Sequence, residues 1–272
     1  MSPSDVMEND EFFAEAGRKL YDRVIIEMFR RVYKPDVDLL PFAKDELVQV
    51  CRELDIVINN VPDIPYHYRT GRSDLPDEIL STGNWVIEGA GKGKYAFIRL
   101  KRAPYIHVPD DLYVTEIPEA TPDIVLKYGG GDEQAMLTRI RYNRLVDTFL
   151  SLTAYHLQGH VRSSVQDIGQ VEVDDLYVGV DTTGKWYVIP VEAKGVGLQE
   201  RLGVIQIRQM ILFARQHYGD LTLRPIGIKP LDDGSYVFLE FDDEAELEAI
   251  SVKRYARYKL VRDDARSLSN AR

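Results

Sequence analysis

Residues 171–195 read VEVDDLYVGVDTTGKWYVIPVEAKG, and this stretch decides how the rest of the chain is interpreted. Two apolar runs, which we predict to be strands, are separated by the polar segment DTTGK, in which Thr-Gly is typical of a hairpin turn. Charged residues stand at one end of each run: Asp174, Asp175, Glu192 and Lys194. Because acids and lysine are poor strand formers, these residues indicate something other than sheet formation.

Strand geometry brings these charges together. Side chains alternate across a strand, so Glu192 and Lys194 point to one face and Ala193 to the other. If the two runs form a hairpin, the aspartates and Glu192 lie at the same end of a sheet. Converging carboxylates are costly without a cation, and Mg²⁺ suits them because it takes oxygen ligands from one or two carboxylates, water and substrate phosphate. The backbone carbonyl of Ala193 is a further candidate ligand.

A metal ion held there would lower the pKa of a bound water and stabilise charge on a phosphoryl oxygen. Lys194 would position the attacking water or stabilise developing negative charge. These parts together indicate hydrolysis of a phosphodiester. Alternation leaves two candidates for the first carboxylate, because Asp174 and Asp175 point to opposite faces of their strand. We keep both as catalytic residues and metal ligands beside Glu192, with a preference for Asp174.

The segments around this hairpin predict a sheet covered by helices. A long helix is expected from Glu133 to about Leu157, where Gly159 ends it, followed by a strand near residues 161–166. A helix that is apolar nearly all round is expected at about residues 198–218, and such a helix is buried. One or two strands follow, in LRPIGIKP and GSYVFLEF, before a basic tail. The fold class is therefore α/β or α+β, with a central mixed sheet flanked by helices.

The N-terminal part is predicted to be a separate, helix-rich domain. Helices are expected at about residues 10–33 and 44–54 and again up to Leu80, followed by a hairpin in NWVIEGA and KYAFIRLKR. This order of elements, with a basic hairpin, is typical of a winged-helix DNA-binding module. The run Gly129–Asp132 is the best linker, so we expect an N-terminal domain at 1–128 and a second domain at 132–272. Four basic residues of the first domain are candidates for contact with DNA: Arg69, Arg72, Lys92 and Lys94.

Composition restricts the class of protein. The chain has 272 residues, a net charge of −10 and one cysteine, Cys51. A single cysteine permits no internal disulfide and makes a cysteine zinc site a poor interpretation. We find no apolar run of membrane-spanning length and no signal-peptide pattern, so we expect an intracellular, cytoplasmic protein of prokaryotic type without membrane partners. The negative charge argues against a non-specific nucleic-acid coat but not against a nucleic-acid enzyme.

The stretch from Val171 to Gly195 resembles the signature of the PD-(D/E)xK nuclease superfamily. In that superfamily an aspartate on one strand is followed by an acid-x-lysine triplet on the next, here Glu192-Ala193-Lys194. No proline precedes the aspartates, and GQVEVDD…VEAK is more similar to the Mrr-like and junction-resolvase branches. The resemblance covers about residues 133–240. It implies the restriction-endonuclease-like fold.

The resemblance also implies supporting residues. A glutamine on the helix after the triplet often lies near the site, and Gln206 and Gln209 are the candidates. An acid on the preceding helix is often present, and Asp147 is the available match. Arg162, on the incoming strand, is a candidate contact to the substrate backbone.

The implied activity is that of a Mg²⁺-dependent DNA endonuclease, with Mn²⁺ as an accepted substitute. Double-stranded DNA would be the substrate, and cutting two strands with one site per chain implies a homodimer. A restriction endonuclease of a host-defence system, type II or Mrr-like, is the first interpretation. The alternatives are a junction resolvase, a repair or transposon-associated nuclease of the same fold, and a catalytically silent DNA-binding protein.

Overall fold

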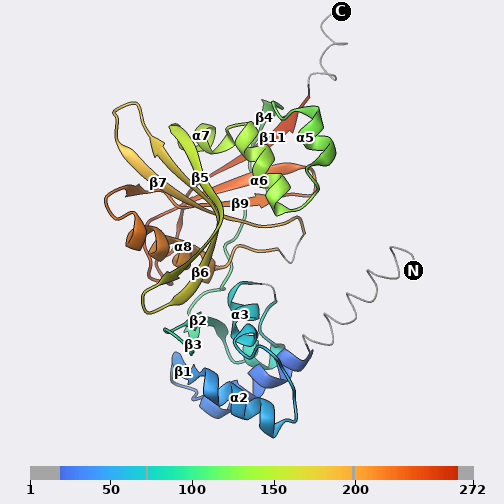
Figure 1. The fold of residues 1–272 in the computed structure, drawn as a ribbon, viewed down its shortest axis with the longest axis vertical. Helices are drawn as coiled ribbons and strands as arrows, with labels where there is room; N and C mark the ends of the chain where they lie inside the picture. The colour runs from blue at the N-terminus through green and yellow to red at the C-terminus, as the bar shows by residue number, and fades with distance from the viewer. Residues whose placement is uncertain (1–18, 72, 198–199, 263–272) are drawn as a thin grey trace, which may run out of the picture. The chain divides into compact units, whose positions relative to one another are not determined.

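The computed structural model describes residues 19–71, 73–197 and 200–262. Contacts between residues divide the chain into two compact units (Figure 1). The first comprises Met1–Pro104 with Gln166–Gly169, and the second comprises Tyr105–Val165 with Gln170–Arg272. The boundary that we expected, at residues 128–132, therefore lies inside the second unit.

The first unit combines helices with a three-stranded antiparallel sheet. A helix is described over residues 19–32, and the elements that follow it in the chain are β1 (Leu39–Ala43), α2 (Lys44–Glu53), α3 (Asp63–Arg69), α4 (Asp77–Leu80), β2 (Asn84–Gly89) and β3 (Lys94–Leu100). The strand order in the sheet is β1-β3-β2. An aromatic group lies at the centre of this unit, where Phe29 contacts Trp85 and Phe97 edge to face with ring centroids 5.2 and 5.1 Å apart. All three rings are buried, so the unit has a core of its own.

The expected hairpin and the helix from Lys44 are present, but one helix was not expected. Helix α3 lies between the helix expected at 44–54 and the one expected to end at Leu80, in a stretch for which no helix was predicted. Pro62 precedes the first turn of α3, where proline is tolerated because the missing N–H would have no partner within the helix. At the other end the Thr70 hydroxyl donates to the Tyr66 carbonyl, and Gly71 follows with φ of +73°. The part of the expected first helix before residue 19 lies outside the described residues.

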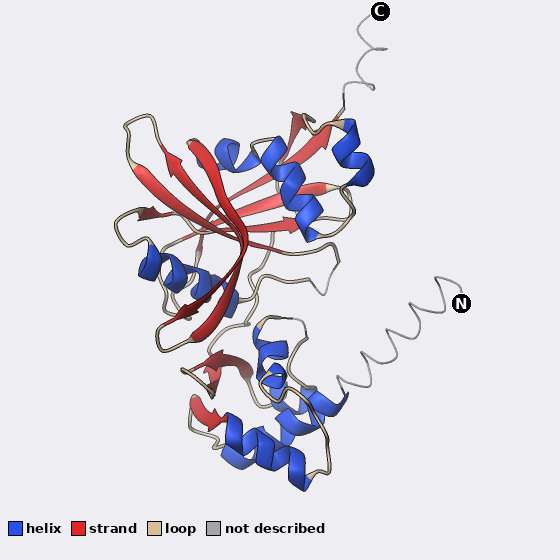
Figure 2. Cartoon of the chain, in the orientation of Figure 1, coloured by secondary structure: helices blue, strands red, loops and turns tan. Residues whose placement is uncertain are grey.

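The second unit is built on a curled, mixed, eight-stranded sheet with helices on its faces (Figure 2). Its strands are β4 (Val114–Pro118), β5 (Thr153–Val165), β6 (Gly169–Val180), β7 (Trp186–Ala193), β8 (Thr222–Leu223), β9 (Ile226–Pro230), β10 (Ser235–Phe241) and β11 (Val252–Val261). The order is β4-β11-β10-β9-β7-β6-β5, and β8 pairs with β7. Strand β7 is parallel to β8 and β9, and β4 is parallel to β11, while β10 is antiparallel to β9 and β11 and β6 is antiparallel to β7. Its helices are α5 (Asp123–Tyr128), α6 (Glu133–Tyr142), α7 (Leu145–Leu150) and α8 (Val204–His217).

The predicted hairpin of residues 171–195 is confirmed as β6 and β7. The two strands are antiparallel, with Asp175 opposite Val191 and Val180 opposite Trp186. In the turn between them, the Asp181 carboxylate accepts hydrogen bonds from the backbone N–H groups of Thr183 and Lys185. The hairpin therefore brings the start of β6 and the end of β7 to the same end of the sheet.

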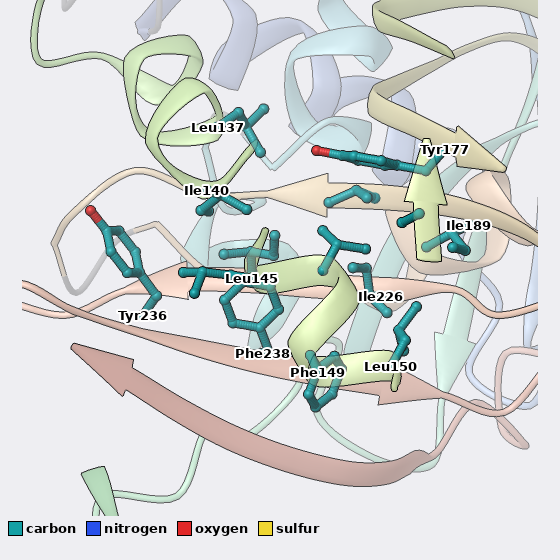
Figure 3. Close-up of a cluster of buried hydrophobic side chains, with 14 of the residues drawn as sticks. Leu137, Ile140, Leu145, Phe149, Leu150, Tyr177, Ile189, Ile226, Tyr236 and Phe238 are labelled. Carbon is teal, nitrogen blue, oxygen red and sulfur yellow. The ribbon is translucent and has the colours of Figure 1, made fainter. Parts of the chain in front are cut away.

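Successive side chains of β7 point to opposite faces of the sheet, and the two faces pack against different helices. Ile189, Val191 and Ala193 are buried in a core with α6 and α7 (Figure 3). Glu192, between two of these residues, bonds instead to a side chain of α8. Helices α6 and α7 thus cover one face of the sheet and α8 covers the other, as expected for a buried helix after the triplet.

The prediction of one long helix over residues 133–157 is wrong for the second half of that range. Helix α6 ends at Tyr142, the short α7 follows, and strand β5 begins at Thr153. Arg144 and Ser151, which flank α7, have left-handed φ values of 49° and 55° and break the helical path without a glycine or proline. The segment that was expected to be a basic tail is instead a strand over residues 252–261, because these residues form β11 beside β10. None of the described helices is both long enough and apolar enough to cross a membrane.

Candidate active site

Asp174 and Glu192 stand on neighbouring strands where the β6–β7 hairpin is open. The Asp174 Oδ2 accepts a hydrogen bond of 2.8 Å from the Ala193 N–H, which fixes this carboxylate against β7. The N–H and C=O of one strand residue point to the same neighbouring strand, so the Ala193 carbonyl is also directed toward the Asp174 side of β7. The carboxylates of Asp174 and Glu192 and the carbonyl of Ala193 therefore lie close together on two adjacent strands.

Lys194 and Gln206 orient Glu192. The Lys194 Nζ donates to the Glu192 Oε1 at 2.8 Å, as the predicted shared face requires. The Gln206 side-chain amide, in the first turn of α8, donates to the same oxygen, and its own Oε1 accepts from the Gly203 N–H at 3.3 Å. Glu192 is only 4% exposed and Lys194 9%, so these bonds hold the triplet in a largely dry environment.

The nearby positive charge does not fully offset the negative charges of the buried carboxylates Asp174 and Glu133. Burial and the nearby Glu192 and Glu133 raise the pKa of Asp174 to about 9. Burial and Glu192 likewise raise the pKa of Glu133 to about 7. Burial opposes the charge of Lys194, but Glu192 and Asp174 outweigh it and raise the pKa of this lysine. Lys194 is therefore an ammonium group at neutral pH and acts as a donor, not as a base.

Glu133 is the residue of this cluster that the sequence analysis missed. It lies in the first turn of α6, whose N-terminus is capped by Asp132 through a bond to the Ala135 N–H. The available signal was Gly-Gly-Gly-Asp-Glu, a linker followed by a good N-cap. Asp147, the acid chosen instead, accepts from the Ala154 N–H and from the Arg144 guanidinium. Its role at the site is therefore corrected, because it fastens α7 to the start of β5.

Asp175 is not a metal-ligand candidate in this structure. It is fully buried and points to the α6 face, opposite to Asp174. The Arg141 guanidinium binds both of its oxygens at 2.8 and 3.0 Å, and His156 Nε2 and the Tyr177 hydroxyl lie within hydrogen-bonding distance, each at 2.7 Å. With its oxygens already engaged by these groups, Asp175 links α6, β5 and β6 and is corrected from ligand to structural anchor.

Two further candidates lie near the site in sequence but take other positions. Gln209 is buried in α8, and its Nε2 has no hydrogen-bond partner within the described part of the chain. Of the two candidate glutamines, Gln206 is the one whose side chain donates a hydrogen bond to Glu192. Arg162 is exposed and pairs with Glu172 at 2.7 Å.

The residues of the first unit that were predicted to contact DNA differ in their exposure to solvent. Lys92 and Lys94 are exposed at the β2–β3 turn, where Gly91 and Gly93 both have positive φ. Arg69 is only 8% exposed, and its guanidinium lies 5.5 Å from the centre of the Tyr66 ring. Arg69 is therefore corrected to a buried packing residue in this structure. Arg72 lies outside the described residues.

A metal ion at the candidate site would have only a few protein ligands. Within residues 19–71, 73–197 and 200–262, no group of three or more His, Cys, Asp or Glu side chains is arranged to hold a metal ion. Mg²⁺ does not need such a group, because it keeps several waters and uses one or two carboxylates. Asp174, Glu192 and the Ala193 carbonyl fit that requirement. Burial, with Glu192 and Glu133 nearby, raises the pKa of Asp174, and a bound cation would offset these like charges.

Comparison with known proteins finds no matching family model, no matching curated protein and no matching solved structure. The function is therefore argued from the site itself.

Proposed function

We propose that this protein is a Mg²⁺-dependent DNA endonuclease of the PD-(D/E)xK type, with a restriction-endonuclease-like catalytic unit. One observation carries the proposal: Asp174 and the Glu192-Ala193-Lys194 triplet lie together where two adjacent strands meet, with Gln206 bonded to Glu192. A solvated hairpin with surface charges would not bury Glu192 and Lys194 to this extent. The layered sheet with α6 and α8 on opposite faces is consistent with that fold.

Each residue has a role in the proposed reaction. Asp174, Glu192 and the Ala193 carbonyl would hold Mg²⁺, which supplies Lewis-acid stabilisation of a phosphoryl oxygen and lowers the pKa of a water. Lys194, as an ammonium, would orient the attacking water and stabilise charge on the phosphate. Water adds to phosphorus as the P–O bond to the leaving sugar oxygen breaks, and one proton passes to that oxygen. Gln206 keeps Glu192 in its orientation.

The first unit is proposed to bind double-stranded DNA as a winged-helix-like module. Its element order of helix, strand, three helices and hairpin, with the sheet order β1-β3-β2, supports this interpretation. The exposed Lys92 and Lys94 at the hairpin turn are suited to phosphate contacts. A homodimer would allow both strands to be cut, because each chain carries one candidate site.

Host-defence restriction inside a prokaryotic cell is the proposed setting. The test is incubation of the wild-type protein with Mg²⁺ and methylated and unmethylated plasmid and genomic DNA, followed by sequencing of the ends. We expect double-strand cleavage by the wild type, and none by Lys194→Ala or Glu192→Ala. Mn²⁺ is expected to replace Mg²⁺ in the same assay.

The outcomes separate the alternatives. Cleavage of a branched junction but not of linear duplex would replace restriction with junction resolution. A wild-type protein that cuts no DNA substrate under any of these conditions would remove the enzyme proposal and leave a DNA-binding role. Wild-type rates in Lys194→Ala would show that the site lies elsewhere.

A further inference from the structure

The side chain of Lys229 is turned toward the loop that follows the triplet. Its Nζ donates to the Gly195 carbonyl at 2.9 Å and to the Gly197 carbonyl at 2.7 Å. The preceding residue of β9, Ile228, accepts a bond of 3.0 Å from the Lys194 N–H. Two successive residues of β9 thus hold the chain from Lys194 to Gly197 by three hydrogen bonds.

The hydrogen-bond partners of Lys229 are neutral groups. Among the residues that the structure describes, Lys229 forms no ion pair within 4 Å, and both of its hydrogen bonds go to neutral carbonyls. Burial lowers the pKa of Lys229, against the opposing effect of Glu200 and Asp232. A partly buried ammonium directed at two carbonyls makes charge-assisted hydrogen bonds, which are stronger than bonds between neutral groups.

The loop contains two glycines, and the Gly197 carbonyl that Lys229 binds also accepts a backbone bond of 3.3 Å from the Glu200 N–H. Gly195 has no side chain, and Gly197 has φ of +120°, a conformation that favours glycine. Gly195 and Val196 line a cavity of about 300 Å³ together with Glu133. Gly197 lines a second cavity, of about 320 Å³, together with Lys229 and Glu200. Glycine allows the backbone at these two positions many conformations, so hydrogen bonds to their carbonyls are suited to select one of them.

We propose that Lys229 is a positioning residue for the candidate active site. By fixing the carbonyls of Gly195 and Gly197, it keeps the end of β7 in place, and with it the Ala193 carbonyl and the Lys194 ammonium. Lys229 does not contact the reacting groups, and it acts through this loop. The inference rests on the proposed nuclease function and assigns to it a residue outside the acid-x-lysine signature.

The first test measures single-turnover cleavage by Lys229→Met, which keeps the length of the side chain but cannot donate. We expect the rate to fall about 10- to 100-fold, the effect typical of residues that orient metal ligands. DNA affinity measured with Ca²⁺ in place of Mg²⁺ is expected to stay at the wild-type value, and Lys229→Arg, which can still donate to two carbonyls, is expected to recover part of the rate. Lys259→Met is the matched control: Lys259 lies in β11 near Asp233, and this variant is expected to keep the wild-type rate.

The second test does not depend on cleavage. Hydrogen exchange of the Lys194 amide, which is bonded to Ile228, is expected to be faster in Lys229→Met than in the wild type, with all proteins compared at the same interval below their melting temperatures. Equal exchange, or a wild-type cleavage rate in Lys229→Met, overturns the inference. If the wild type cuts no DNA but exchange still accelerates, the nuclease function fails while the positioning of the loop stands. If Lys229→Met does not fold, Lys229→Gln takes its place in both tests.

Discussion

Asp174 and Asp175 are adjacent, and their opposite environments follow from strand alternation. Asp175 has an arginine, a tyrosine and a histidine around it, whereas Asp174 has one backbone donor and two other carboxylates nearby. The pKa of Asp174 is accordingly raised to about 9. A raised pKa in the folded state means that the unfolded chain loses its proton first as pH rises, so the free energy of unfolding falls as the pH rises.

The metal-free protein is therefore expected to lose stability as pH rises from about 4, the usual pKa of an aspartate, to about 9. Below that range the contribution of Asp174 is fully present. Mg²⁺ binds the ionised carboxylates, so its stabilising effect is expected to increase over the same range. Melting temperatures measured from pH 4 to 9, with and without Mg²⁺, check this. A stability that is flat across the range in the absence of metal would contradict the raised pKa.

Variants identify the source of this pH dependence. Asp174→Asn is expected to remove most of the loss and leave a smaller one that ends near pH 7, where Glu133 titrates. Glu133→Gln removes a like charge beside Asp174, so the loss is expected to end at a lower pH than in the wild type. Asp147→Asn is the matched control, since Asp147 bonds to Arg144 and Ala154 and is expected to leave the profile unchanged.

At the scale of elements, the Arg141–Asp175 pair joins helix α6 to strand β6. The carboxylate is fully buried and the guanidinium side chain is 25% exposed. Arg141→Met is expected to lower the free energy of unfolding by about 3–5 kcal/mol, because it leaves a buried charge without its main partner. Chemical denaturation measures this change. Arg162→Met, which breaks an exposed pair with Glu172, is the control, and its expected cost is at most about 1 kcal/mol. Similar losses in both variants would contradict the structural role of Asp175.

Local patterns predicted some elements and not others, for physical reasons. The β6–β7 hairpin was predictable because apolar alternation, a Thr-Gly turn and terminal charges all agree. The break between α6 and β5 was not, because Arg144 and Ser151 adopt left-handed conformations that their residue types do not favour. Glu133 lies at the start of α6, whereas Asp147, the acid that was predicted to lie near the site, is in α7, beyond Arg144. The Arg141–Asp175 pair joins residues 34 apart, a separation that no local pattern reports.

Over the whole molecule, the negative charge and the proposed DNA partner must be reconciled. A net charge of −10 repels a polyanion, so binding has to rely on local positive surface. The described part of the first unit offers Lys92 and Lys94 at the exposed β2–β3 turn, where Lys44 also approaches Gly93. The acidic groups of the candidate site would be offset by the metal that they hold.

DNA binding that relies on a few lysines is expected to depend on salt concentration. Each phosphate contact by a lysine releases counterions and contributes about −0.9 to the slope of log K against log salt for duplex DNA. Lys92→Ala combined with Lys94→Ala is therefore expected to make the slope less negative by up to about 2, with an unchanged melting temperature because both side chains are exposed. Titration of duplex DNA with Ca²⁺ at several salt concentrations measures the slope. Lys185→Ala, an exposed lysine in the β6–β7 turn of the other unit, is the matched control. If the double variant and this control have the same slope as the wild type, the DNA-binding surface is not the β2–β3 turn.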